Sequence, residues 1–145
     1  MKDNSYKRHI AKTITWRIIG TVDTIFLSWV ILGDPIIALQ IGGAEVVTKM
    51  LLYYFHERIW FKINLGEGAE GISRLRHIFK TVSWRVVGTV DTMILAWLIS
   101  GSPMMGLKIG LVEVVTKMLL YYFHERVWYK VNYGLSNREN SKINT

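Results

Sequence analysis

The apolar residues of this chain are gathered into four long blocks, at about 15–32, 36–60, 83–100 and 104–128. At a rise of about 1.5 Å per residue, a helix of each length crosses the roughly 30 Å hydrocarbon core of a membrane. Gly-Asp-Pro and Gly-Ser-Pro separate the paired blocks and predict tight turns. The pattern therefore predicts an all-α integral membrane protein with four transmembrane helices in two helical hairpins.

The second half of the chain repeats the first at a shift of 68 positions. Close to two-thirds of positions 8–66 are identical to their partners at 76–134, and Glu45 to Arg58 recurs unchanged at Glu113 to Arg126. This is a tandem duplication. Because each copy contains two spans, both copies insert in the same orientation, which predicts pseudo-twofold symmetry along the membrane normal.

The repeat also predicts how the chain is divided. A basic N-terminal segment precedes the first hairpin, a polar and flexible linker joins the hairpins, and a polar tail follows the second. These five segments are 1–14, 15–66 (first hairpin), 67–75 (linker), 76–134 (second hairpin) and 135–145 (tail).

Composition and charge agree with a membrane location. The chain is 50% hydrophobic and contains no cysteine, which excludes disulfides and thiolate metal sites. Its formal net charge is +7, and the basic residues cluster at the termini and between the hairpins but are absent from both turns. The positive-inside rule therefore places both termini in the cytoplasm, and we expect no nucleic-acid binding. The basic start lacks a small-residue cleavage site, so we interpret the first block as a retained span.

One face of the second span in each copy is polar. At helical spacing its glutamate, lysine and histidine fall on a stripe about 60° wide. These residues are Glu45, Lys49 and His56, and in the second copy Glu113, Lys117 and His124. Burying a charge in lipid costs about 2.5 to 3.5 kcal/mol, so such residues pair or line a wet cavity. The spacing from glutamate to lysine suits an ion pair that fixes helix register, and an ion or proton pathway is the alternative.

The first span of each copy carries an aspartate, Asp23 or Asp91, about two helical turns inside the membrane. The nearest deep cations on another helix are Lys49 and Lys117, which predicts an aspartate-to-lysine bridge. Small residues recur every four positions in the same spans and predict close helix packing. They are Gly20, Thr24 and Ser28, and Gly88, Thr92 and Ala96.

Aromatic and basic residues near the span ends are typical of the headgroup region. The predicted anchors are Trp16, Arg17, Trp60, Trp84, Arg85 and Trp128. Snorkelling explains the two arginines, with attraction of an anion as the alternative. His56 and His124 could meet near the axis beside glutamates, but their spacing is a weak metal pattern and a proton relay suits histidine better. We predict no metal and no cofactor, and the absence of catalytic motifs predicts that the chain is not an enzyme.

Each copy carries the pattern K-T-x-[TS]-W-R-x-x-G-T-x-D-T, then G-x-P, then E-V-x-T-K-x-x-L-Y-Y-x-H-E-R-x-W. This pattern resembles a family of small bacterial membrane proteins called domain of unknown function 2061, over both repeats. The resemblance implies two fused two-helix units and a multi-pass protein of the bacterial inner membrane.

Two functions fit these features. The leading hypothesis is a small channel or transporter-like protein for an anion or a proton. Its path would be lined by Asp23, Glu45, Lys49 and His56, and by Asp91, Glu113, Lys117 and His124. The alternative is a non-transporting scaffold or accessory subunit whose buried charges are interhelical bridges and whose basic face meets a partner protein or anionic lipid. Either would be embedded in the lipid bilayer, and because four short spans make a thin bundle, we expect a homo-oligomer.

Overall fold

The computed structural model describes residues 3–63 and 70–131, and the predicted tail at 135–145 lies outside this part of the chain. The described residues form four helices: α1 (Asp3–Leu32), α2 (Pro35–Lys62), α3 (Glu70–Ser100) and α4 (Pro103–Lys130). α1 begins inside the predicted basic segment, and α3 begins inside the predicted linker. The helices are longer than the predicted spans. Hydropathy marks only the part of a helix that can lie in lipid, whereas helical hydrogen bonds continue beyond it into water.

The two turns are built by equivalent residues. Gly33 and Gly101 end α1 and α3 with φ of 74° and 75°, a left-handed conformation that glycine adopts without steric cost. Asp34 caps α2, since its Oδ1 accepts from the amides two and three residues on at 2.8 and 3.2 Å. Ser102 caps α4 through a longer bond of 3.4 Å. A proline follows each cap and starts the next helix.

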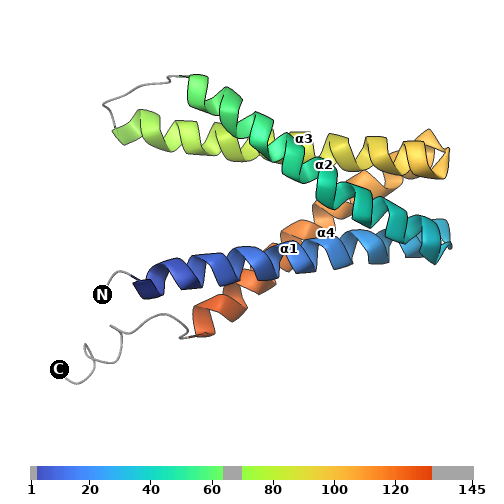
Figure 1. The fold of residues 1–145 in the computed structure, drawn as a ribbon, viewed down its shortest axis with the longest axis horizontal. Coiled ribbons are helices and arrows are strands. Elements are labelled where there is room, and N and C mark those ends of the chain that lie inside the picture. Colours follow the sequence, from blue (N-terminus) through green and yellow to red (C-terminus); the bar gives the residue numbers. More distant parts are fainter. Residues whose placement is uncertain (1–2, 64–69, 132–145) are drawn as a thin grey trace.

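α1 packs against α2 and α4, and α3 packs against α4 and α2. Figure 1 shows that α1 begins and α4 ends at one end of the bundle, where α2 also ends and α3 begins. We call this the terminal end. Both turns lie at the opposite end, the turn end, and α2 and α4 cross near the middle of the bundle (Figure 1).

The bundle buries more polar side chains than hydrophobic ones. Among the described residues, eight polar or charged side chains are buried, against five hydrophobic ones. Large apolar side chains such as Ile18 and Phe26 point outward and are 58% and 56% exposed. A soluble protein would not expose apolar residues on this scale, whereas lipid tails solvate them. The distribution is that of a membrane protein.

Three helices are long and apolar enough to cross a membrane: Tyr6–Leu32, Pro35–Lys62 and Arg74–Ser100. α4 is not among them. It carries Lys108 where α2 has Gln40, in addition to the glutamate and lysine that both helices share. This extra charge lowers the mean hydropathy of α4. By length and composition, three of the four predicted spans are therefore supported.

Between the middle of the bundle and the turn end, the fully buried side chains are apolar except for Ser28 on α1. Ile41, Ala96 and Ile109 have no exposed surface and pack together. We call these three residues the apolar block. It joins α2, α3 and α4, and therefore links the two copies of the repeat.

Glycines bring the two helices of each copy into close contact. A Cβ on Gly42 of α2 would lie 2.3 Å from Cγ1 of Ile25 on α1. A Cβ on Gly106 of α4 would lie 2.4 Å from the backbone oxygen of Met93 on α3, and Gly110 also abuts Met93. The sequence analysis missed these glycines, although the four-residue spacing of Gly106 and Gly110 is the small-residue signal it used for α1 and α3.

Candidate functional site

Four charged side chains from α2 and α4 meet in the centre of the bundle and form what we call the charge cluster: Glu45, Lys49, Glu113 and Lys117. Each lysine contacts the glutamate one turn before it on its own helix. Each also reaches the other copy, since Lys49 Nζ lies 3.4 Å from Glu113 Oε1 and Lys117 Nζ lies 3.2 Å from Glu45 Oε1. The glutamates are only 5% and 4% exposed. Two positive and two negative charges thus compensate each other across the crossing of α2 and α4.

The small-residue faces of α1 and α3 complete the surroundings of the lysines. Lys117 Nζ donates to Thr24 Oγ1 at 3.2 Å, and Lys49 Nζ donates to Thr92 Oγ1 at 3.0 Å. Both threonines are fully buried. The lysine stem passes close to the glycine one turn earlier, since a Cβ on Gly20 would lie in ordinary van der Waals contact with Lys117 Cε at 3.9 Å. The predicted packing face therefore also positions the buried cations.

The aspartates are bonded to threonines of the other copy. Thr116 Oγ1 donates to Asp23 Oδ2 at 3.0 Å, and Thr48 Oγ1 donates to Asp91 Oδ2 at 2.8 Å. The predicted aspartate-to-lysine bridge is wrong, since no ion pair joins these aspartates to a lysine within residues 3–63 and 70–131. The reason is the helix geometry: the threonine faces the aspartate, and the lysine that follows it is turned about 100° towards the glutamates.

The histidines lie nearer the terminal end, each in a different interface. His56 Nε2 is 2.8 Å from Ser83 Oγ between α2 and α3, whereas His124 Nε2 is 2.9 Å from Thr15 Oγ1 between α4 and α1. The idea that the two histidines meet near the axis as metal ligands is therefore wrong. Among the described residues, no group of three side chains is arranged to hold a metal ion.

Tryptophans surround each histidine. The rings of Trp16 and His124 lie 5.5 Å apart, and those of Trp84 and His56 lie 5.4 Å apart. Trp128 Nε1 donates to His124 Nε2 at 3.0 Å. The predicted interface anchors thus also enclose the histidines.

Trp60, one helical turn after His56, shares the hydroxyl partner of that histidine. Trp60 Nε1 donates to Ser83 Oγ at 3.1 Å. The two predicted arginine anchors, Arg17 and Arg85, are both exposed. The Arg85 guanidinium lies 5.9 Å from the ring centre of Tyr121.

Ion pairs that the sequence analysis missed join the copies at the terminal end. Lys12 Nζ is 2.6 Å from Glu125 Oε1, and Lys80 Nζ is 2.7 Å from Glu57 Oε1. The signal was present in the repeat, where each glutamate and each lysine recurs at the same offset, but pairing across copies needs the tertiary structure.

Arginines also cap the ends of α2 and α4. Arg8 donates to the backbone oxygens of Trp128 and Val131 at 2.6 and 2.7 Å. Arg76 donates to the backbone oxygen of Trp60 at 3.0 Å. Helix ends leave carbonyls without intrahelical partners, so each arginine of one copy satisfies the other copy's helix.

Some buried polar atoms have no hydrogen-bond partner among the described residues. They include one carboxylate oxygen of each cluster glutamate, Glu45 Oε2 and Glu113 Oε2, and Nδ1 of His56 and of His124. Ser28 Oγ on α1 is another. Buried polar atoms are normally satisfied by protein groups or by ordered water. These positions are thus suited to internal water or to an exchangeable proton.

Comparison with known proteins agrees with the repeat. Residues 10–61 and 78–129 each match the model of a family described as "Predicted membrane protein (DUF2061)". No curated protein and no solved structure matches the chain. The two matches cover most of both repeats and confirm the tandem duplication. The chain belongs to this family of predicted membrane proteins, as two tandem copies of the family unit.

Proposed function

We propose that this protein is a non-transporting scaffold or accessory subunit of the bacterial inner membrane, without catalytic activity, in which buried charges hold two helical hairpins together. The charge cluster carries the proposal. Each lysine is bound by a glutamate of its own copy and by one of the other copy. A buried pair is costly to break because one partner is left uncompensated, so the cluster ties the two copies in a single register.

The apolar block argues against an open path through this conformation. Ile41, Ala96 and Ile109 have no exposed surface and lie between the charge cluster and the turn end. An ion leaving the cluster towards the turns would meet these apolar side chains, with the Ser28 hydroxyl as one buried polar group on α1. Moving a charge into such surroundings costs several kcal/mol. In a static bundle, the same block stabilises the packing of the helices, and it buries no charge.

The proposal includes the complete membrane topology. We propose that α4 also spans the membrane, because Glu113 and Lys117 compensate each other and Lys108 lies about 7.5 Å along the helix from Pro103, within snorkelling reach of the turn-side interface. The terminal end then faces the cytoplasm by the positive-inside rule. A pseudo-twofold axis along the membrane normal relates the hairpins, as the paired cluster contacts support.

The outer surface suits partners in the membrane and at its cytoplasmic face. Apolar side chains of all four helices face outward, including Ile18, Val47, Val86 and Val115. A second copy of the chain or another membrane protein would pack against such a surface, and the basic terminal end would attract acidic protein segments or anionic lipid. We therefore propose that the scaffold acts as a homo-oligomer or within a larger complex.

A pathway for a small ion is the second candidate, and the unpartnered atoms favour it. Glu45 Oε2, Glu113 Oε2 and Nδ1 of both histidines are buried without partners in the described chain. Carboxylates and imidazoles carry protons in membrane proton relays, so the ion that this candidate best accommodates is a proton. The relay would then have to cross the apolar block by a conformational change.

Flux through proteoliposomes separates the two candidates. The wild-type protein would be tested for proton, chloride and sulfate flux beside the Glu45→Gln/Glu113→Gln variant. The scaffold predicts no flux above empty liposomes and a loss of stability in the variant, measured by unfolding in SDS. Lys108→Gln is the matched control, because it removes an exposed charge from the same helix without touching the cluster. Selective flux that disappears in a well-folded double variant would replace the scaffold by the pathway.

A further inference from the structure

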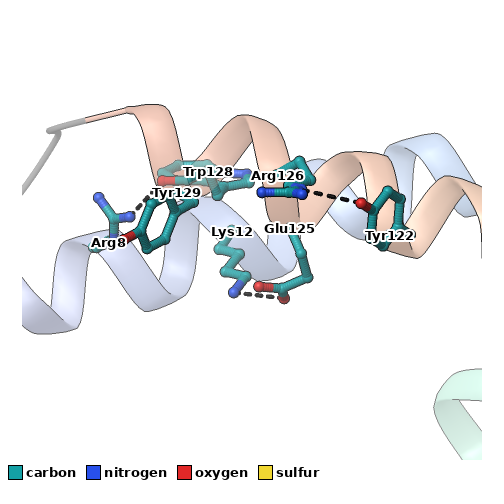
Figure 2. A pocket seen from close by; sticks show the side chains of 7 residues that line it. All are labelled: Arg8, Lys12, Tyr122, Glu125, Arg126, Trp128 and Tyr129. Atoms are coloured by element: carbon teal, nitrogen blue, oxygen red, sulfur yellow. Dashed lines mark hydrogen bonds and ion pairs between the residues drawn. The ribbon is translucent and has the colours of Figure 1, made fainter.

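A pocket opens between the start of α1 and the end of α4. It has a volume of about 400 Å³ and is drawn in Figure 2. Its lining residues are Arg8, Lys12, Tyr122, Glu125, Arg126, Trp128 and Tyr129. None of them belongs to the charge cluster.

The lining carries an excess of positive charge. Three basic residues face one carboxylate, and Lys12 and Glu125 compensate each other at 2.6 Å. Arg126 is exposed and has an aromatic partner, because its Nε donates to the Tyr122 hydroxyl at 3.1 Å. Figure 2 shows its guanidinium beside that hydroxyl and above the Lys12–Glu125 pair. A guanidinium forms paired hydrogen bonds with a phosphate, so the pocket is complementary to a phosphate group.

The pocket also continues into an apolar helix face. At helical spacing, Met118 and Val115 follow Tyr122 on the same side of α4 towards the middle of the bundle. Each is 59% exposed. Tyrosine and tryptophan rings beside cations are typical of the headgroup level, and aliphatic side chains below them suit acyl chains. Along this face, basic side chains are followed by aromatic and then aliphatic ones. This order is complementary to a phospholipid, from its headgroup to its acyl chains.

We propose that this pocket binds one anionic phospholipid, with the phosphate held at Arg126 and an acyl chain along Met118 and Val115. The site lies outside the charge cluster and does not depend on whether the protein is a scaffold or an ion pathway. Arg8, which caps α4, and the Lys12–Glu125 pair form the wall of the pocket.

The equivalent positions at the start of α3 and the end of α2 supply an internal comparison. The equivalent positions hold the same residues, Arg76, Lys80, Tyr54, Glu57, Arg58 and Trp60, except that Phe61 stands where the second copy has Tyr129. A phenylalanine cannot donate to a phosphate. The two sites therefore differ in one hydroxyl, and the site between α1 and α4 is the stronger one.

The test is lipid binding by the full chain in detergent, measured by native mass spectrometry during titration with phosphatidylglycerol or phosphatidylcholine. We expect the wild type to retain phosphatidylglycerol preferentially. One cation near an anionic lipid is worth about 1 kcal/mol, so Arg126→Gln is expected to weaken this binding about fivefold. Arg58→Gln, the matched change in the first copy, is expected to weaken it less, and Tyr129→Phe is expected to make the two sites alike.

Three results would overturn the proposal: equal binding of both lipids, unchanged binding in Arg126→Gln, or equal losses in Arg126→Gln and Arg58→Gln, which would indicate diffuse attraction. Glycerol 3-phosphate tests the source of the phosphate. If it displaces the lipid at equal concentration, the site binds a soluble phosphate and the assignment to a phospholipid is wrong. Far-UV circular dichroism and melting temperature check that each variant is folded, and Tyr129→Phe keeps its ring in place.

Discussion

The contacts within each copy and the contacts between the copies are made by different chemistry. Within a copy, the two helices meet at glycines against apolar side chains, Gly42 against Ile25 and Gly110 against Met93. Between copies, the helices meet through lysines, carboxylates, hydroxyls and imidazoles. Among the interhelical hydrogen bonds and ion pairs described above, all join different copies.

One weaker bond is the exception within a copy, from Thr92 on α3 to Glu113 on α4 at 3.4 Å. The difference teaches how the fold is specified. Apolar packing brings two helices together without selecting one partner strongly, because lipid solvates apolar surface equally well. Buried polar groups have few acceptable partners, so they select the arrangement of the hairpins.

Removing one cation from the charge cluster should break the contact between copies most severely. Lys117→Met leaves Glu113 and Glu45 facing only one lysine, and we expect unfolding in SDS to be easier by about 3 to 5 kcal/mol. The combined variant Glu45→Gln/Lys49→Met/Glu113→Gln/Lys117→Met should cost less than the single change, since no uncompensated charge remains. If the single and combined variants lose stability in proportion to the number of substitutions, the cluster does not act as a unit.

The contact between the two helices of one copy should be sensitive to side-chain size and not to charge. Gly106→Ala places a Cβ 2.4 Å from the Met93 backbone oxygen, and such overpacking costs about 1 to 3 kcal/mol. Gly43 is the control, because a Cβ there meets nothing within 4 Å. Gly43→Ala should leave the free energy of unfolding unchanged or raise it slightly. Equal effects of the two substitutions would contradict the close approach of α3 and α4.

The hydrogen bond between Asp23 and Thr116 is a contact between the copies whose loss should have a smaller effect on stability. A double-mutant cycle of Asp23→Asn and Thr116→Val measures its coupling, expected at about 0.6 to 1.7 kcal/mol for a hydrogen bond between membrane helices. The equivalent pair of Asp91 and Thr48 should give a similar value. A cycle of Asp23 with Lys49, the bridge predicted from the sequence, should give coupling near zero.

The histidine contacts should contribute least. Ser83→Ala removes the hydroxyl that His56 and Trp60 share, and we expect a loss of about 0.6 kcal/mol in unfolding experiments. Ser83→Thr keeps the hydroxyl and reproduces Thr15, the equivalent residue of the other copy, so it should restore the wild-type stability. A loss in the threonine variant as large as in the alanine variant would indicate that packing, and not the hydrogen bond, matters there.

Much of the architecture was predictable because it depends on local chemistry. The apolar blocks, Gly33 and Gly101 with their following prolines, and the repeat of the whole pattern led to four helices with two tight turns. The polar stripe was also predictable, since the spacing of Glu45, Lys49 and His56 places them on one helix face. Lys108 changed the composition of α4 enough that only three helices resemble spans by hydropathy.

The choice of partners was not predictable from spacing. Several acceptors on other helices could pair with Lys49, and the sequence analysis selected Asp23 or Asp91 because the lysines are the nearest deep cations on another helix. The structure instead pairs each aspartate with a threonine. It also separates His56 from His124, which a repeat about one axis could equally have brought together.

The sequence by itself determined the secondary structure, the duplication and the faces that carry charge, because helical periodicity and hydropathy are properties of neighbouring residues. Only the tertiary structure decided which buried groups meet. The crossing of α2 and α4 and the close approach at glycines set the distances between groups that are 16 to 123 positions apart in the chain. Hydrogen bonds and ion pairs require partners within about 3 Å, so those distances, and not residue types alone, assign each partner.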